Sequence, residues 1–234
     1  MTLVKGLESA QSLFSLTIED ICFIRNSQQI LNNISLSITA GDFILMTGHN
    51  GSGKSTLLKI LSGLLQPNKF WHLAQQTAER KNWKQSKKFL RRKFCYLHQT
   101  PYLFAGTVYD NIAYGLKRQG VAKNLIDAKV REALQAISLE HLIHRDSRQL
   151  SGGEKQRVAI ARSWVIRPQF ILLDEPFANM DKHSRRDCYA LVNQLKDDGI
   201  GVILTSHDAH SGELKFNRHM HLYQGCISEK TGKN

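Results

Sequence analysis

The chain has 234 residues, of which 41% are hydrophobic and 22% are charged, and its formal net charge is +12. This length and composition indicate a folded globular protein with one sizeable core, and they exclude a disordered chain. No run approaches the roughly 18 consecutive apolar residues of a membrane span, the start lacks the apolar segment of a secretion signal, and four scattered cysteines without a CxxC pair exclude a zinc knuckle or a disulfide framework.

Two strands and one helix are predicted in the first third of the chain. ILNNISLSI (30–38) alternates in hydrophobicity, which is typical of a half-buried strand. GDFILMTG (41–48) is a short continuous apolar run ending in glycine, which is typical of a buried strand. STLLKILSGLL (55–65) has apolar residues at helical spacing, with Gly63 and Pro67 near its end. The three segments together predict two strands followed by a helix.

The densest basic run is RKNWKQSKKFLRRK (80–93), in which Trp83 and Phe89 are interleaved with the charges. Basic residues with aromatic residues available for stacking are typical of nucleic-acid binding. The alternative, which we favour, is a solvated face near a membrane-associated partner. The run alone does not decide between the two.

The middle of the chain has a helical character. From about residue 101 to 162 no long apolar run occurs. DAKVREALQAI (127–137) places its apolar residues on one helical face, and GGEKQRVAIARSWVI (152–166) predicts a second helix. This block therefore predicts a helical subdomain.

Strand patterns return in the last third of the chain. FILLDEP (170–176) and GVILTSH (201–207) indicate buried strands, and Leu191 and Leu195 belong to an amphipathic helix between them. HMHLYQGCIS (219–228) predicts a hairpin that turns at its Gln-Gly pair. Strands that alternate with helices predict an α/β fold with a largely parallel sheet.

The stretch GHNGSGKS lies between a predicted strand and a predicted helix and fits the pattern G-x-x-x-x-G-K-[ST]. Its glycines permit backbone angles that side chains forbid, so that N–H groups at the helix N-terminus can point at phosphate oxygens. Lys54 supplies a charge for the β- and γ-phosphates, Ser55 a hydroxyl for Mg²⁺, and Thr56 a further phosphate contact. The motif alone leaves kinases, GTPases, helicases and transporters open. The predicted nucleotide-binding residues of this stretch are Gly48, His49, Asn50, Gly51, Ser52, Gly53, Lys54, Ser55 and Thr56.

The acidic end of FILLDEP supplies a partner for this loop. Asp174 emerges at the carboxyl end of a buried strand, where ligands bind in open α/β sheets, and it can hold Mg²⁺ directly or through water. The next residue, Glu175, points elsewhere and is placed to orient and deprotonate a water that attacks the γ-phosphate. A second carboxylate beside the metal acid favours hydrolysis over phosphoryl transfer to another substrate.

The stretch LSGGEKQR (150–157) resembles the signature motif of the ATP-binding cassette (ABC) family across all eight residues, in the expected order between GHNGSGKS and FILLDEP. A single phosphate-binding site does not require this motif. Ser151, Gly152 and Gly153 precede a predicted helix, and they therefore form a second anion-binding N-terminus. The resemblance implies that these residues contact the γ-phosphate bound by GHNGSGKS of another subunit, with two ATP molecules between two head-to-tail cassettes.

Three further positions match the family pattern, and a fourth departs from it. Gln99 in YLHQTPYLF resembles the glutamine that reaches Mg²⁺ and the attacking water, and Asp181 in ANMD resembles the aspartate that couples the two sites. His207 resembles the switch histidine that contacts the γ-phosphate. The family usually stacks an aromatic residue on adenine, but Arg25 occupies that place here, so either Arg25 or Phe23 takes the role.

The resemblance covers residues 16 to 228 and implies one ABC ATPase domain over 1–234. Its expected architecture is a P-loop NTPase (RecA-like) core at about 1–98 and 166–234, with a mostly parallel sheet, a small antiparallel β region and a helical subdomain at about 100–165. The segment PNKFWHLAQQTAERKNW lacks the glycine that the family usually has after this proline, so we expect an irregular β region there.

The resemblance also implies cofactors, partners and a location. The cofactors would be ATP and Mg²⁺, and the partners a second cassette, transmembrane permease subunits and a periplasmic or extracellular binding protein that acts through the permease. A cytoplasmic helix of the permease would enter a groove near residues 99–111, whose apolar residues are otherwise core of the helical subdomain. The chain would then be cytoplasmic, on the inner face of the cell membrane.

The transported substrate cannot be read from these motifs. ILNNISLSI and QTPYLFAGTVYDNI resemble two branches of the family, namely ATPases of tungstate or related oxyanion importers and a small iron-exporter ATPase. TVYDNIAYGLK resembles the pattern of importers, and this resemblance favours import, of an oxyanion or a metal, over export. A soluble ABC ATPase that acts on nucleic acid is the alternative from another class, which the basic run at 80–93 supports weakly.

Overall fold

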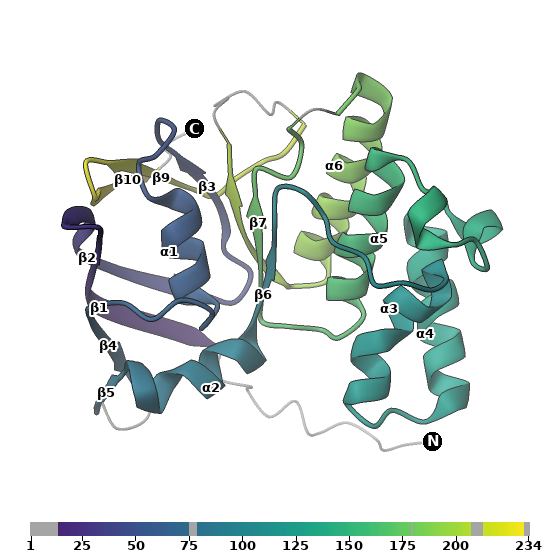
Figure 1. Cartoon of the computed structure of the whole chain (residues 1–234), viewed down its shortest axis with the longest axis horizontal. Helices are drawn as coiled ribbons and strands as arrows, with labels where there is room; N and C mark the ends of the chain where they lie inside the picture. The colour runs from purple at the N-terminus through teal and green to yellow at the C-terminus, as the bar shows by residue number, and fades with distance from the viewer. Residues whose placement is uncertain (1–13, 75–78, 179, 207–212, 232–234) are drawn as a thin grey trace, which may run out of the picture.

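A six-stranded sheet forms the centre of the protein in the computed structural model, which describes residues 14–74, 79–178, 180–206 and 213–231. The strand order is β10-β9-β3-β8-β7-β6, and every neighbouring pair is parallel except β9 and β10. The chain therefore has the expected α/β fold with a mostly parallel sheet (Figure 1). The strands are β3 (Phe43–Thr47), β6 (Phe94–Leu97), β7 (Phe170–Asp174), β8 (Gly201–Thr205), β9 (Arg218–Tyr223) and β10 (Cys226–Thr231).

A smaller antiparallel sheet, of order β2-β1-β4-β5, covers one side of the central sheet. Register shifts interrupt the pairing of β1 with both β2 and β4, and Asp20 within β1 has a positive φ of 57°. The expected small antiparallel region is present. Its irregularity lies in β1, whereas the described part of the segment 67–83, where we expected it, pairs β4 with β5 without a register shift. Its strands are β1 (Ser15–Arg25), β2 (Gln28–Thr39), β4 (Lys69–Leu73) and β5 (Arg80–Asn82).

Helices cover both faces of the central sheet (Figure 1). Helices α1 (Lys54–Leu61) and α2 (Trp83–Lys93) lie on the side of the antiparallel sheet. On the other side lie α3 (Val108–Arg118), α4 (Lys123–Ala136), α5 (Gly152–Trp164) and α6 (Lys182–Asp197), with short 3-10 turns at Glu140–Leu142 and Ser147–Gln149. Within the described part of the chain, no helix combines the length and the apolar content that crossing a bilayer requires.

The continuous apolar runs of the central strands have a simple cause: both of their faces are buried. Along β3, Phe43 and Leu45 pack into the core shared with α3 to α6, whereas Ile44 and Met46 pack into the core shared with α1, α2 and the antiparallel sheet. The helices α3 to α6 therefore share one core with a face of the sheet. The division into a core and a separate helical subdomain remains a prediction.

Helix α2 occupies most of the basic run that was considered for nucleic-acid binding. Asn82 and Gln85 form a capping box at its start, which satisfies two backbone N–H groups. Trp83 is buried against Phe70, and Phe89 is stacked on His72 with 5.0 Å between ring centroids. Trp83 therefore belongs to the core and the partly buried Phe89 packs against it, so both rings are engaged within the fold, which supports the solvated-face interpretation.

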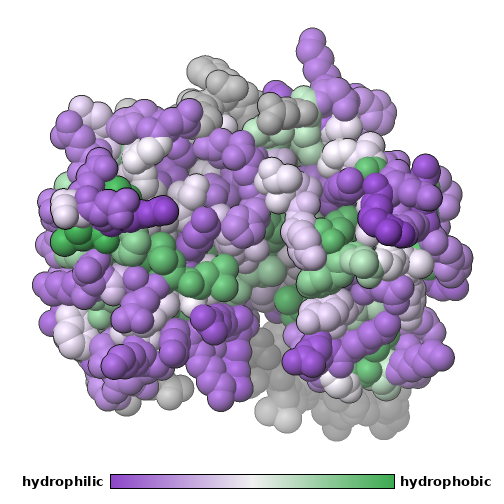
Figure 2. Space-filling view, in the orientation of Figure 1, coloured by the Kyte–Doolittle hydropathy of each residue, from purple (hydrophilic) through white to green (hydrophobic). Residues whose placement is uncertain are grey.

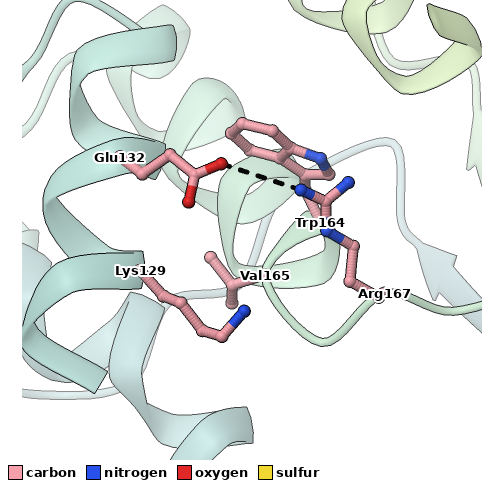
Figure 3. Close-up of a pocket in the computed structure, with 5 residues that line it drawn as sticks. All are labelled: Lys129, Glu132, Trp164, Val165 and Arg167. Atoms are coloured by element: carbon pink, nitrogen blue, oxygen red, sulfur yellow. Dashed lines mark ion pairs between the residues drawn. The ribbon is translucent and has the colours of Figure 1, made fainter. Parts of the chain in front are cut away.

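A small hollow at the end of α5 contains none of the predicted site residues (Figure 3). Arg167 reaches across it to Glu132 of α4, with Nη2 and Oε1 3.7 Å apart, and its guanidinium lies over the Trp164 ring. Arg167 and Trp164 Nε1 both donate to the carboxylate of Asp198 at the end of α6, each at 2.5 Å. The contacts around the hollow therefore link α4, the end of α5 and the end of α6.

Candidate functional site

The phosphate loop, residues 48–56, runs from the end of β3 into the first turn of α1 as the motif predicts. Gly48 has a φ of 150°, and a Cβ atom there would lie 2.4 Å from the Leu222 carbonyl oxygen. Gly53 caps α1 with a φ of 105°, a conformation that residues with side chains rarely adopt. The loop can therefore turn tightly and present the free N–H groups of the first turn of α1 to an anion.

Lys54 lies inside this loop with only 5% of its surface exposed. Its Nζ donates to the carbonyl oxygens of Gly48 at 2.7 Å and His49 at 3.1 Å, and lies 3.9 Å from Oε1 of Glu175. Burial lowers the pKa of Lys54, while the charges of Glu175 and Asp174 oppose that shift. The ammonium group is thus held at the centre of the loop.

The loop also contains a polar atom that lacks a partner. The hydroxyl of Ser52 is buried, and no hydrogen-bond partner lies near it among the described residues. Because an unpaired buried hydroxyl is costly, such a group calls for a polar ligand. A phosphate oxygen fits both this hydroxyl and the Lys54 ammonium, so the loop fits the triphosphate of a nucleotide.

Asp174 ends β7 and is 6% exposed. Its Oδ1 accepts a hydrogen bond from the Thr205 hydroxyl at 3.0 Å, and its Oδ2 accepts one from the Tyr96 hydroxyl at 2.7 Å. Mg²⁺ in nucleotide sites is usually held by one or two carboxylates together with phosphate oxygens and water. An oriented carboxylate near the phosphate loop, with the Ser55 hydroxyl in the first turn of α1, fits that ion.

Glu175 adopts a left-handed conformation, with a φ of 47°. Its backbone N–H donates to the Thr205 hydroxyl at 2.8 Å, and its side chain turns toward Lys54 and Gln99. The Gln99 Nε2 atom donates to Glu175 Oε2 at 3.4 Å. A residue with a side chain held in this conformation is uncommon, and such residues cluster at functional sites. The structure thus brings Lys54, Gln99 and Glu175 together.

The signature motif forms the start of α5. Ser151 caps this helix, and it forms a capping box with Glu154 in which the Ser151 N–H donates to Glu154 Oε2 at 2.7 Å. The helix begins at Gly152, as the pattern of 152–166 predicts, so the two glycines are its first residues and only Ser151 precedes it. The free N–H groups of the first turn therefore lie at the signature glycines.

An open cavity of about 350 Å³ lies in front of this helix start. Gln99, Pro176 and Asp181 line it together with the signature residues 151–153. The Gln156 side chain also lines the cavity, and its buried Nε2 has no hydrogen-bond partner among the described residues. A helix N-terminus and an unpaired amide donor thus face one space, which fits a polar ligand.

The two anion-binding helix starts face different spaces. None of the described lining residues of the signature cavity comes from the phosphate loop. The phosphate loop and the signature helix of one chain therefore do not line a common cavity among the described residues.

Four other predicted site residues have separate surroundings. Asp181 caps α6, where its carboxylate accepts from the N–H of Ser184 at 2.9 Å and from its hydroxyl at 2.8 Å, and these bonds lower the pKa of Asp181. Arg25 is exposed at the end of β1, whereas Phe23 is partly buried against the core. Arg25 is therefore the freer of the two for a nucleotide base. His207 lies outside the described residues.

A family model described as ABC transporter matches residues 31–178, which is more than half of the chain. The chain belongs to the ABC transporter family. The matched range includes the phosphate loop, the signature motif and the acidic end of β7. This ABC subunit binds ATP, and subunits of its kind hydrolyse it.

Known proteins similar to this ABC subunit cover most of its length. A putative ABC transporter ATP-binding protein of Clostridium acetobutylicum is 33% identical over 206 residues, 86% of each chain. A molybdate/tungstate import ATP-binding protein, WtpC, of Pyrococcus abyssi is 41% identical over 156 residues, 66% of this chain but only 44% of that protein. The structure of cbiO1 from Clostridium perfringens, part of the ABC transporter complex cbiONQ, matches with a TM-score of 0.80 and 26% identity over 92% of this chain and 88% of that one. The predicted P-loop NTPase fold is thereby confirmed.

A groove of about 380 Å³, which we call the aromatic groove, runs along the free edge of β6. Tyr102 and Tyr114 are 70% and 47% exposed beside it, whereas Val108 and Ile112 of the same stretch are fully buried. A groove is thus present near the predicted place, and other residues of the same stretch belong to the core of this ABC subunit. Its use by a permease helix stays a prediction. Six of the residues that line the groove are Tyr96, His98, Tyr102, Phe104, Tyr114 and Ile166.

Two polar side chains hold the aromatic loop of this groove in place. Asn111 is fully buried, accepts from the Phe104 N–H at 2.8 Å and donates to the carbonyl oxygens of Phe104 and Thr107 at 3.0 Å. Arg162 donates to the Tyr102 carbonyl oxygen at 2.8 Å, and its guanidinium lies 4.9 Å from the centre of the Phe104 ring. The groove is thus a built feature of the fold.

Tyr96 is a site residue that the sequence analysis missed. It lines the aromatic groove, and its hydroxyl donates to Asp174. Burial raises the pKa of Tyr96, as does the hydrogen bond to Asp174, so its hydroxyl keeps the proton that it donates. The only signal in the sequence is its place three residues before Gln99, which does not reveal a partner on another strand.

Replacing Tyr96 by phenylalanine is expected to weaken divalent-ion binding. The change removes one hydrogen bond that orients Asp174, and losing such an outer partner typically lowers metal affinity by about 10-fold or more. Mn²⁺ titrations followed by electron paramagnetic resonance, with a non-hydrolysable ATP analogue present, measure this directly. Tyr114→Phe, which removes a hydroxyl from an exposed tyrosine of the same groove, is the control. Equal Mn²⁺ affinity of the two variants would contradict an orienting role.

Proposed function

We propose that two copies of this ABC subunit close head to tail around two ATP molecules and that their closure drives transport through separate permease subunits. The observation that carries the proposal is the pair of anion-binding helix starts, at α1 and α5, which face different spaces. In a two-fold dimer each phosphate loop meets the signature helix of the other chain. Every unsatisfied donor named above, on Ser52 and Gln156, then gains access to a phosphate.

The proposed catalytic residues surround the end of the phosphate loop. Glu175 orients and deprotonates the attacking water, Gln99 positions it, and His207 contacts the γ-phosphate. The hydrogen bond from Gln99 to Glu175 and the nearby Lys54 ammonium support this arrangement. Lys54 and the loop N–H groups stabilise the negative charge that develops on the phosphates.

Further proposed contacts hold Mg²⁺ and the adenine ring of ATP and couple the two sites. Ser55, Gln99 and Asp174 would hold Mg²⁺, which supplies charge neutralisation on the phosphate oxygens when bound. Arg25 would stack on adenine, for which its exposed position at the end of β1 is suitable. Asp181 would couple the two sites, because it caps α6 and lines the signature cavity at the same time.

The aromatic groove is the proposed contact with the permease. A groove with exposed aromatic side chains suits an amphipathic helix, which lays its apolar face into it. The subunit would then lie on the cytoplasmic face of the membrane. A binding protein outside the membrane would act through the same permease.

For the direction of transport we propose import, of an oxyanion or a metal. The Pyrococcus abyssi relative supports an oxyanion, since its name describes molybdate/tungstate import. The chain spans less than half of that protein, so the similarity concerns the ATP-binding part alone. Export of iron or another small substrate is the competing possibility. In export the substrate moves away from the side of the membrane on which ATP binds, and in import it moves toward that side.

Transport direction can be tested in proteoliposomes that contain the subunit with its co-purified permease. For an importer, substrate is expected to accumulate inside only when ATP is enclosed in the lumen, because ATP and delivered substrate share one side. Labelled molybdate and ferrous iron are the probes, and Glu175→Gln complexes are the control for ATP-independent leakage. Accumulation driven by external ATP alone would show export and contradict the proposal.

A further inference from the structure

The exposed face of α2 carries a continuous basic stripe. Among the 14 residues 80–93 there are eight lysines and arginines and no acidic residue. Five of the cations recur along the helix at intervals of three and four residues, which places them on one side. The opposite side carries the buried Trp83, Ser86 and Leu90. The basic stripe consists of Lys84, Lys87, Lys88, Arg91 and Arg92, all exposed.

Among the residues that the structure describes, these cations form no ion pair. The ion pairs formed by described residues include Lys69, Arg80 and Lys81 near this helix, but none of the five stripe residues. Arg91 donates its Nε to the Gly63 carbonyl oxygen at 2.9 Å, which satisfies a donor and leaves its charge unbalanced. Unbalanced like charges at neighbouring helix positions repel each other, so the stripe costs stability in the isolated chain.

The stripe lies next to the aromatic groove in the fold. Helix α2 ends at Lys93, and β6, whose residues 95–97 line the groove, begins at Phe94. In Figure 1 α2 lies below the antiparallel sheet and runs directly into β6, and the surface over α2 is mostly hydrophilic in Figure 2. A permease bound in the groove would therefore bring the stripe close to the membrane.

We propose that the basic stripe of α2 binds the anionic lipid headgroups of the membrane surface beside the permease. The proposal rests on the proposed function, because the permease contact is what brings α2 to the bilayer. Cytoplasmic leaflets are negatively charged, and each lysine or arginine near such a surface strengthens binding by about fivefold. The exposed cations form a row on one face of the helix, and the buried apolar residues lie on the other face. Such a row matches a surface of phosphate groups.

Lipid is favoured over nucleic acid by the orientation of the aromatic residues. Trp83 is 7% exposed, and Phe89 is stacked on His72 within the fold, so neither is free to stack on a base. Single-strand binders combine basic grooves with exposed aromatic platforms. The stripe has the charge of such a site without the platform, and it lies on a convex helix face.

The test compares a stripe variant with a charge-matched control in vesicle sedimentation without nucleotide. The wild-type chain is expected to bind vesicles of phosphatidylcholine mixed with phosphatidylglycerol, to release them as salt is raised, and to ignore pure phosphatidylcholine. Reversing three lysines should weaken binding by at least about 100-fold. The stripe variant is Lys84→Glu, Lys87→Glu and Lys88→Glu; Arg91 is retained because its bond to Gly63 supports the fold.

The control reverses three exposed cations of α3 and α4, which lie at the right in Figure 1, apart from α2 at the lower left. It changes the net charge equally, so it should lose far less vesicle affinity than the stripe variant. Equal losses of vesicle affinity in the two variants would overturn the proposal. It would also be overturned if the wild-type chain bound duplex DNA more tightly than vesicles and the stripe variant lost that DNA binding. Because no ATP is present, a failure of nucleotide-driven dimer formation leaves this result unaffected. The control substitutions are Arg118→Glu, Lys123→Glu and Arg131→Glu.

Discussion

Glu175→Gln is expected to lower the rate of ATP hydrolysis by about 10²- to 10⁴-fold, which is what loss of a general base costs. The amide keeps the size of the carboxylate but cannot take a proton from water. The residue can still be held in place after the change. The Gln99 amide can donate to the remaining side-chain oxygen, and the Thr205 hydroxyl still accepts from the backbone N–H. Single-turnover hydrolysis measured by rapid quench reports the chemical step.

ATP binding should survive this change. The contacts proposed for phosphate come from Lys54, Ser52 and the loop N–H groups, and none requires the Glu175 charge. Removing that charge also removes a negative neighbour from the phosphates, so the ATP-bound dimer is expected to persist and to be visible by sedimentation velocity. Glu140→Gln, an exposed glutamate of the helical region, is the control for loss of an acid. Full turnover by Glu175→Gln would show that another group acts as the base.

Mixing two inactive variants is expected to restore an active site. Lys54→Ala disables the phosphate loop, and Ser151→Arg fills the signature cavity with a bulky side chain. In a head-to-tail dimer with one copy of each, one site holds both defects and the other holds none. Because neither variant is expected to dimerise alone, every dimer in the mixture is mixed and has one of its two sites intact, so the mixture should reach up to about half of the wild-type rate.

Dimer formation provides the readout that does not depend on turnover. Fluorescently labelled Lys54→Ala should associate with Ser151→Arg in the presence of ATP, whereas each variant alone should stay monomeric. The matched control mixes Lys54→Ala with the double variant carrying both changes, which leaves no intact site in any dimer. If the first mixture remained monomeric with ATP, each chain would have to hold its nucleotide without the other, and the shared-site proposal would fail.

Local motifs predicted the centre of the fold well, because their signals lie within single short segments. The phosphate loop lies between β3 and α1 as expected, and the β9–β10 hairpin turns at Gln224 and Gly225, both with positive φ. The signature motif was placed correctly to within two residues at the start of α5. In each case backbone preferences and hydrophobic periodicity point to the same structure.

Features that depend on distant contacts were missed. Tyr96 bonds to Asp174, 78 residues away in the chain, and nothing in its own neighbourhood indicates that partner. The α2 segment was not predicted to be a helix, because lysines and arginines obscured the spacing of Trp83, Ser86 and Leu90. Its capping box, Asn82 with Gln85, was a usable signal. Burial of aromatic residues within a basic run emerges only from tertiary packing.

Tyr96 contributes to both the aromatic groove and the surroundings of Asp174, and this has a thermodynamic consequence. Its ring lines the aromatic groove, while its hydroxyl holds Asp174. A partner that covers the ring excludes water and lowers the local dielectric, which strengthens this hydrogen bond. In the proposed complex, occupancy of the groove and binding of the divalent ion would then be linked equilibria. Because linkage is reciprocal, a subunit with metal and nucleotide bound would hold the proposed permease helix more tightly by the same factor.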